Sequence, residues 1–169
     1  MKRIISLIAC LCLAMMLFVA CGDKEKETEK KEENKENKKV TMDVAATADT
    51  LLDKVKFVDK MSPIDQIDFF AALFSIEADD VKEQKSYTST GATAEMISAV
   101  KCKDADAANR VKEAFEAYTK DLSSQYADYK PEECDKLDNP VIMVYDEYVI
   151  ICVSDDNDTA TKTIEGQVK

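Results

Sequence analysis

The sequence predicts an α+β domain in residues 41–169, with a four-stranded, mainly antiparallel sheet and helices packed on one of its faces. Three observations support this fold class. Apolar residues at helical spacing open the region, two pairs of short β-rich segments follow, and each pair precedes an aspartate-rich stretch and another helical pattern. The expected order is therefore helix, helix and then strand–strand–helix twice.

Two helices are expected before the first strand. Apolar residues recur at helical spacing over residues 41–58, from Val44 to Val58. The second helix is expected to start at Ser62, a good N-cap, with Pro63 at its first position and Asp65 in a capping-box-like pattern. Its predicted buried stripe consists of Ile64, Ile67, Phe70, Ala71 and Phe74, widened by Phe69 and Leu73.

Residues 81–89 and 94–103 are expected to form the first pair of strands, with Gly91 in the turn between them. Residues 81–89 are mostly polar and suit an edge strand, whereas 94–103 are apolar enough for the inside of a sheet. Asp104 then caps a long helix, and Pro131 begins a short turn or helix that ends before Pro140. The inward positions of the long helix are Ala108, Val111, Phe115, Tyr118, Leu122 and Tyr126.

Residues 141–145 and 148–154 are rich in Val, Ile and Tyr and are expected to form a hairpin. The intervening Asp146-Glu147 lacks glycine, which predicts a turn wider than two residues. Asp155 and Asp158 are expected to cap a last helix. Both halves place a cysteine-bearing strand before an aspartate-rich cap and a helix, which suggests a ββα-ββα repeat.

Residues 1–20 are typical of a secretory signal, with Lys2 and Arg3 before an uncharged, mainly apolar run. The run ends in Ala20-Cys21, a small residue before a cysteine, as in a bacterial lipobox. We expect cleavage before Cys21 and transfer of a diacylglycerol to its thiol, although Phe18 stands where the lipobox prefers leucine. An uncleaved anchor helix stays open, because 17 residues approach the roughly 20 that a span needs.

Residues 21–40 are expected to be a lipidated cysteine followed by a disordered, hydrophilic spacer. From Asp23 to Lys39 there is no apolar residue, and seven acids balance seven lysines. Such a segment buries nothing that could offset the entropy of ordering it. The remaining domain carries 14 basic and 27 acidic residues, a net charge of -13. This field repels nucleic acid and anionic lipid headgroups, so no nucleic-acid partner is expected.

Four stretches between Phe69 and Gly166 carry a family resemblance. They are FFAALFSIEADDV, STGATAEMISAVKCKD, the segment Tyr126–Lys136, and KLDNPVIMVYDEYVIICVSDD. With the lipobox and the charged spacer, they resemble lipoproteins of low-GC Gram-positive bacteria that carry domain of unknown function 4358. The resemblance implies a fold and a location at the outer face of the cytoplasmic membrane, and it implies no catalytic activity.

The composition excludes several catalytic designs. The chain has no histidine, which removes His-dependent triads and His-containing zinc sites, and its three glycines form no phosphate-binding loop. Residues 155–159 resemble calcium ligands, but an EF-hand needs Gly and Glu where this chain has Ala160 and Gly166. Helix capping explains these acids, so no metal and no cofactor are expected.

The domain contains Cys102, Cys134 and Cys152. A disulfide between Cys102 and Cys152 stays open outside the membrane, although buried free thiols are the favoured interpretation. The chain has no CxxC spacing that would favour a metal site, and no histidine to activate a catalytic thiol.

Adjacent carboxylates at 79–80, 132–133 and 146–147 would serve a hydrolase only if two faced each other across a cleft, and the sequence selects no pair. The tyrosines either pack in the core or line a groove for a peptide or a sugar. They are Tyr118, Tyr126, Tyr129, Tyr145 and Tyr148.

The expected function is a lipid-anchored, non-enzymatic binding or accessory module with an extracytoplasmic protein or peptide partner. One alternative is a carboxylate-dependent hydrolase of cell-wall sugars or peptides. Another is a solute receptor for a transporter, but such receptors usually have two lobes and this domain is large enough for one.

Overall fold

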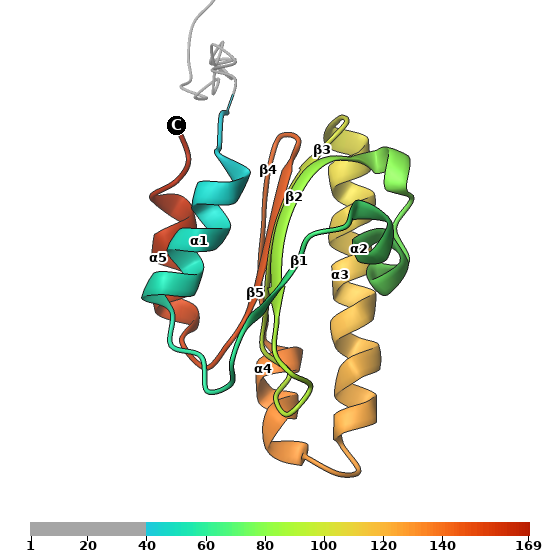
Figure 1. Cartoon of the computed structure of the whole chain (residues 1–169), viewed down its shortest axis with the longest axis vertical. Coiled ribbons are helices and arrows are strands. Elements are labelled where there is room, and N and C mark those ends of the chain that lie inside the picture. Colours follow the sequence, from blue (N-terminus) through green and yellow to red (C-terminus); the bar gives the residue numbers. More distant parts are fainter. Residues whose placement is uncertain (1–39) are drawn as a thin grey trace, which may run out of the picture. The chain divides into compact units, whose positions relative to one another are not determined.

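The fold is seen in a computed structural model that describes residues 40–169 (Figure 1). The predicted signal peptide, the lipidated Cys21 and the spacer up to Lys39 lie outside the described residues. Residues 40–169 form five α-helices and a five-stranded antiparallel sheet, so the predicted α+β class is confirmed. Within this range, no helix combines the length and the apolar character needed to cross a membrane.

The sheet has the strand order β1-β2-β3-β5-β4, and each neighbouring pair is antiparallel. Its strands are β1 (Ser62–Ile64), β2 (Val81–Thr88), β3 (Met96–Cys102), β4 (Val141–Tyr145) and β5 (Tyr148–Val153). The prediction of four strands missed β1. Because β1 pairs with residues 86–88 of β2, that end of the mostly polar β2 lies inside the sheet, whereas residues 81–85 are paired with β3 alone and form the edge that its composition predicted.

Helices cover both faces of the sheet, so the prediction of helices on one face is wrong (Figure 1). The helices are α1 (Val44–Lys54), α2 (Ile67–Phe74), α3 (Ala105–Tyr126), α4 (Cys134–Asp138) and α5 (Asn157–Glu165). One core, the α3-side core, lies between the sheet and helices α2, α3 and α4. The other, the α1-side core, lies between the sheet and helices α1 and α5.

The central strands, β3 and β5, explain why helices cover both faces of the sheet. On β3, Met96 and Val100 belong to the α3-side core, while Ile97 and Ala99 belong to the α1-side core. Strand β5 is likewise buried along its whole length. A strand that is apolar on both faces must be covered on both faces.

The predicted start of the second helix is wrong, because Ser62 and Pro63 lie in β1 and the helix begins at Ile67. Sheet pairing outweighs the local capping pattern here: Ile64 is buried, and its carbonyl accepts a hydrogen bond from Gln84 Nε2 at 2.8 Å. Pro63 is compatible with an edge strand, where its missing N–H costs no ladder bond. The shift leaves Ile67 37 % exposed.

Three further boundaries differ from the prediction. Helix α1 ends at Lys54, so Val58 lies beyond it and is 78 % exposed. The β4–β5 turn is tight, with Tyr145 paired to Tyr148 and Asp146 in a left-handed conformation at φ +49°, which aspartate tolerates better than most residues. The last helix is capped by Asp156, not Asp155. The predicted cap of the long helix, Asp104, is confirmed.

The order strand–strand–helix occurs twice, but the packing does not repeat. Helix α3 lies against the α3-side core and α5 against the α1-side core. A two-fold axis relating the antiparallel neighbours β3 and β5 would keep both helices on one face. The two halves are therefore not rotated copies of each other.

Phe70 is fully buried in the α3-side core, where its ring centroid lies 5.0 Å from that of Phe74 and 6.3 Å from that of Phe115. Phe70→Ala should cost about 3–5 kcal/mol of unfolding free energy, a large part of the roughly 5–15 kcal/mol of an ordinary domain. Phe70→Leu should cost much less, because it keeps most of the buried volume. Phe69→Ala, on the same helix at a position 58 % exposed, is the matched control. Equal thermal melts for Phe70→Ala and Phe69→Ala would contradict this packing.

Candidate binding groove along helix α3

Two adjoining hollows run along helix α3. The first, of about 350 Å³, lies between α2 and α3, and the second, of about 260 Å³, lies between α3 and the β2–β3 loop. Both are lined by Tyr118 and Leu122, so we describe them together as the α3 groove. Its other lining includes Leu73, Ala114, Ala117, Asp121, Gln125 and Tyr126 from the helices and residues 88–96 from the loop and its flanking strands.

The lining of the α3 groove is mixed, with polar and apolar side chains in similar share. Tyr118, Leu122 and Leu73 supply aromatic and aliphatic surface, and Asp121 and Gln125 add polar groups from α3. Burial raises the pKa of the Tyr118 hydroxyl, which therefore remains a hydrogen-bond donor at neutral pH. A concave surface that offers both apolar contacts and polar groups able to orient a ligand is suited to binding an extended ligand that is itself part apolar and part polar.

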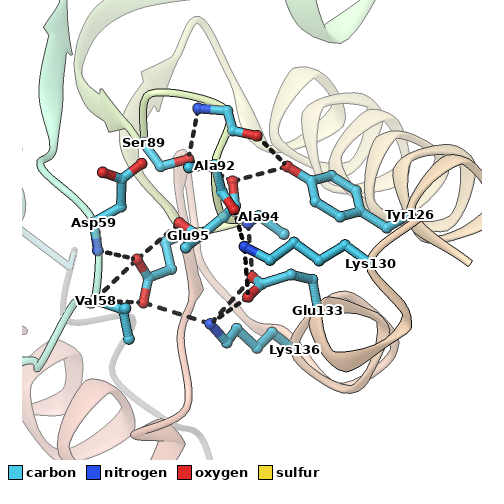
Figure 2. Close-up of polar contacts among 12 residues, drawn as sticks. Val58, Asp59, Ser89, Ala92, Ala94, Glu95, Tyr126, Lys130, Glu133 and Lys136 are labelled. Carbon is cyan, nitrogen blue, oxygen red and sulfur yellow. Dashed lines mark hydrogen bonds and ion pairs between the residues drawn. The ribbon is translucent and has the colours of Figure 1, made fainter.

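The loop that forms one wall of the groove is held through its backbone. Tyr126 Oη donates hydrogen bonds to the carbonyls of Gly91 at 3.1 Å and Thr93 at 2.9 Å, and Lys130 Nζ donates to the carbonyl of Ala92 (Figure 2). Gly91 has φ +91°, a conformation that favours glycine. Three successive carbonyls are thus fixed by side chains that extend from the end of α3 and the residues after it.

Behind this wall lies a buried carboxylate, Glu95, at the start of β3. It is 1 % exposed, and it accepts hydrogen bonds from the backbone N–H groups of Val58 at 2.8 Å and Asp59 at 3.0 Å (Figure 2). It also accepts one from Thr93 Oγ1 at 2.9 Å. Glu95 therefore joins the α1–β1 connection to the β2–β3 loop.

Lys136, on α4, is the cation that compensates this buried charge. Its Nζ lies 3.6 Å from Glu95, 3.1 Å from Glu133 and 3.3 Å from Asp155. Burial alone would lower the pKa of Lys136, but the hydrogen bonds that its ammonium group donates to Glu133 and Asp155, together with the charge of Glu95, outweigh burial and raise it. We call these four residues the Lys136 cluster. Glu133 also accepts a hydrogen bond from the backbone N–H of Ala94 at 2.9 Å. The Lys136 cluster therefore contacts the loop at two residues, Thr93 through Glu95 and Ala94 through Glu133.

Each predicted carboxylate pair contains a residue held in an ion pair. Asp80 accepts hydrogen bonds from Arg110 Nε and Nη2, both at 2.8 Å, and from Lys103, and these bonds hold its pKa far below the usual range. Glu133 belongs to the Lys136 cluster, and Glu147 lies 3.4 Å from Lys101. The acids that line the α3 groove are Glu95 and Asp121, and Glu95 has both oxygens engaged by protein donors.

The cysteines of the described residues are free. Cys102 lies in the α3-side core and Cys152 in the α1-side core, on opposite faces of the sheet, so the pairing left open by the sequence does not form. Burial raises the pKa of each of these thiols to about 12, which keeps them protonated. Over residues 40–169, no group of three or more potential metal-ligating side chains is arranged to hold an ion.

The tyrosines were expected either to pack in the core or to line a groove. Core packing is found for most of them, because Tyr126 and Tyr148 are buried and Tyr118 and Tyr145 pack against the two cores. Tyr118 and Tyr126 line the α3 groove, and the exposed Tyr129 lies with its ring centroid 4.9 Å from that of Tyr126. Tyr145 and Tyr148 flank the β4–β5 turn and belong to the α1 side of the sheet. The sequence did not single out Glu95 or Lys136; the one signal for Glu95 was a charge directly before the apolar run of β3.

A family model described as a domain of unknown function, DUF4358, matches residues 53–154, which is more than half of the chain. This range contains the sheet, α2, α3 and α4, together with the α3 groove, but it leaves out α5 and most of α1. No curated protein and no solved structure matches the chain.

Proposed function

The chain belongs to the DUF4358 family, and we propose that it is a lipid-anchored, extracytoplasmic binding module of a Gram-positive bacterium. Its ligand, in this proposal, is a peptide segment of a partner protein that lies in the α3 groove. The observation that carries the proposal is the groove itself, two adjoining hollows whose lining mixes aromatic and aliphatic side chains with polar ones.

The manner in which the groove is built supports binding rather than catalysis. Its loop wall is fixed by Tyr126, Lys130 and the Lys136 cluster, so the free site is already formed and little ordering entropy is lost when a ligand binds. Glu95 is saturated by protein hydrogen bonds, which leaves Asp121 as the free carboxylate of the lining. A hydrolase of the two-carboxylate type needs a second one.

The entry point of the chain supports a tethered arrangement. Thr41 and Lys169 exchange two backbone hydrogen bonds of 3.1 Å, and the Val40 N–H donates to Asp146 in the β4–β5 turn at 3.1 Å. The loop at residues 89–95 lies at the end of the sheet opposite the β4–β5 turn (Figure 1). This follows from the antiparallel register of β3 and β5, in which Met96 pairs with Val153 and Lys101 with Tyr148. Val40, the first described residue, and the loop at residues 89–95 thus lie at opposite ends of the sheet.

Binding in the groove can be tested with a photoreactive benzophenone residue placed at Leu122 in the full chain on intact cells. The expected result is a covalent adduct with a defined peptide of another extracytoplasmic protein, identified by mass spectrometry. The matched control places the same residue at Lys162, an exposed position on α5 across the sheet. Identical adducts at both positions, or none at Leu122, would contradict the groove as a binding site.

Anchoring is tested by Cys21→Ser. One diacylglycerol contributes two acyl chains, enough for stable attachment to a membrane. The variant should lose incorporation of labelled fatty acid and either leave the membrane fraction or accumulate as an uncut precursor. Labelled lipid on the Cys21→Ser protein would show that the anchor site is elsewhere.

A further inference from the structure

The two edges of the sheet differ in how they are protected. Edge strand β1 has three residues, and one of them is Pro63. Both features discourage pairing with another strand. Edge strand β4 has five residues, Val-Ile-Met-Val-Tyr, with neither a charge nor a proline among them. It therefore carries none of the usual devices that prevent one sheet edge from pairing with another.

The backbone of β4 has groups free for such pairing. The tight turn makes Tyr145 and Tyr148 a hydrogen-bonded pair, and alternation along an antiparallel ladder then directs Met143 and Val141 toward β5. The N–H and C=O groups of Ile142 and Val144 consequently point away from the sheet. Among the described residues, no hydrogen bond outside the sheet ladder engages them.

A hollow of about 600 Å³ lies beside this edge, on the α3 side of the sheet and separate from the α3 groove. Its lining comes from α3, from the end of α4 and from the start of β4: Glu116, Thr119, Lys120, Leu137, Asp138, Pro140 and Ile142. Side chains of a strand added to β4 would have room there. An unpaired edge with an adjacent hollow is the arrangement used in β-strand addition.

We propose that β4 pairs with β4 of a second copy of this chain, antiparallel and centred on Met143. In this register Ile142 lies opposite Val144 of the second copy, so the outward groups of the two strands form hydrogen-bonded pairs. Val141 lies opposite Tyr145, and Met143 lies opposite Met143. Every cross-strand pair is thus apolar, and no charge faces a like charge.

Charged residues near the ends of β4 also favour a second copy of this chain as the partner. Opposite Pro140 the register places Asp146 of the second copy, and Lys120 lines the hollow beside Pro140. Lys120 forms none of the ion pairs found among the described residues, so its ammonium group is available to that carboxylate. Glu116 and Asp138 line the same hollow, and Asp146 Oδ2 also accepts the Val40 N–H, so Lys120 is the group of the hollow that can compensate the added charge. The net charge of -13 on each domain opposes association, and added salt should therefore strengthen it.

The register can be tested by disulfide trapping with the full chain. In a non-hydrogen-bonded antiparallel pair the Cα atoms are about 4.5 Å apart, within the range of about 4.4–6.8 Å that a disulfide needs. Met143→Cys should form a cross-linked dimer under mild oxidation at least about tenfold faster than Val58→Cys, because pairing raises the effective concentration of the thiols. Val58→Cys is the collision control, since Val58 is 78 % exposed and lies in the α1–β1 connection, outside the sheet. The parent chain reports the background from its own cysteines.

Two further cysteine variants fix the pairing. Ile142→Cys alone should cross-link slowly, whereas a mixture of Ile142→Cys and Val144→Cys chains should cross-link rapidly, and all the rates should rise with salt. Val144→Pro removes an outward N–H but no bond to β5, so it should keep the melt and abolish trapping of Met143→Cys. Trapping of Met143→Cys no faster than of Val58→Cys, equal trapping of Ile142→Cys alone, or a cross-link to another protein would overturn the proposal. None of these outcomes depends on the α3 groove or on Cys21.

Discussion

The structure depends on one buried ammonium group. Lys136 Nζ lies within 4 Å of the carboxylates of Glu95, Glu133 and Asp155. These acids stand just before β3, just before α4 and two residues after β5. Burying a charge is costly unless it is paired and hydrogen-bonded. Here each of the two buried carboxylates also accepts backbone N–H groups, Glu95 from Val58 and Asp59 and Glu133 from Ala94. The cluster thus ties together segments that would otherwise be irregular connections.

The α3 groove follows from this constraint. Its floor belongs to α3, which is fixed by the α3-side core, but its wall is a loop with small, exposed residues that would be mobile without support. Glu95 and Glu133 hold the base of the loop, while Tyr126 and Lys130 hold its carbonyls. The Lys136 cluster, Tyr126 and Lys130 therefore have a positioning role. They hold the loop as a preformed surface beside Tyr118 and Leu122 and carry out no chemistry themselves. The binding edge proposed for β4 lies elsewhere and uses the opposite property, a row of backbone groups that the fold leaves unpaired.

The sequence predicted those features that depend on local patterns. Apolar alternation and composition located β4 and β5 closely, and Asp104 marked the start of α3 because its cap is a local hydrogen bond. The prediction from sequence was wrong where contacts between segments far apart in the chain determine the structure. Pro63 reads locally as the start of a helix, yet pairing with Tyr87 makes it part of a strand. The helices on the second face of the sheet were not predicted. A run such as Ile97 to Val100 shows that a strand is buried, but it does not show that helices cover both faces. Lys136 was not predicted, because its three partners lie 3, 19 and 41 residues away in the chain and no sequence pattern connects all four residues.

The central claim, that the Lys136 cluster fixes the groove wall, is tested most directly by hydrogen exchange on Lys136→Met. This variant keeps the aliphatic bulk but leaves the buried Glu95 without a cation and Glu133 with Lys130 alone, at 4.0 Å. Breaking a buried ion pair typically costs about 3–5 kcal/mol. The prediction is a large loss of amide protection at Val58, Asp59 and Ala94, while α5 and its surroundings keep theirs. Lys162→Met, an exposed lysine on α5, is the matched control and should leave all these amides unchanged. Undiminished protection of Val58, Asp59 and Ala94 in Lys136→Met would contradict the claim.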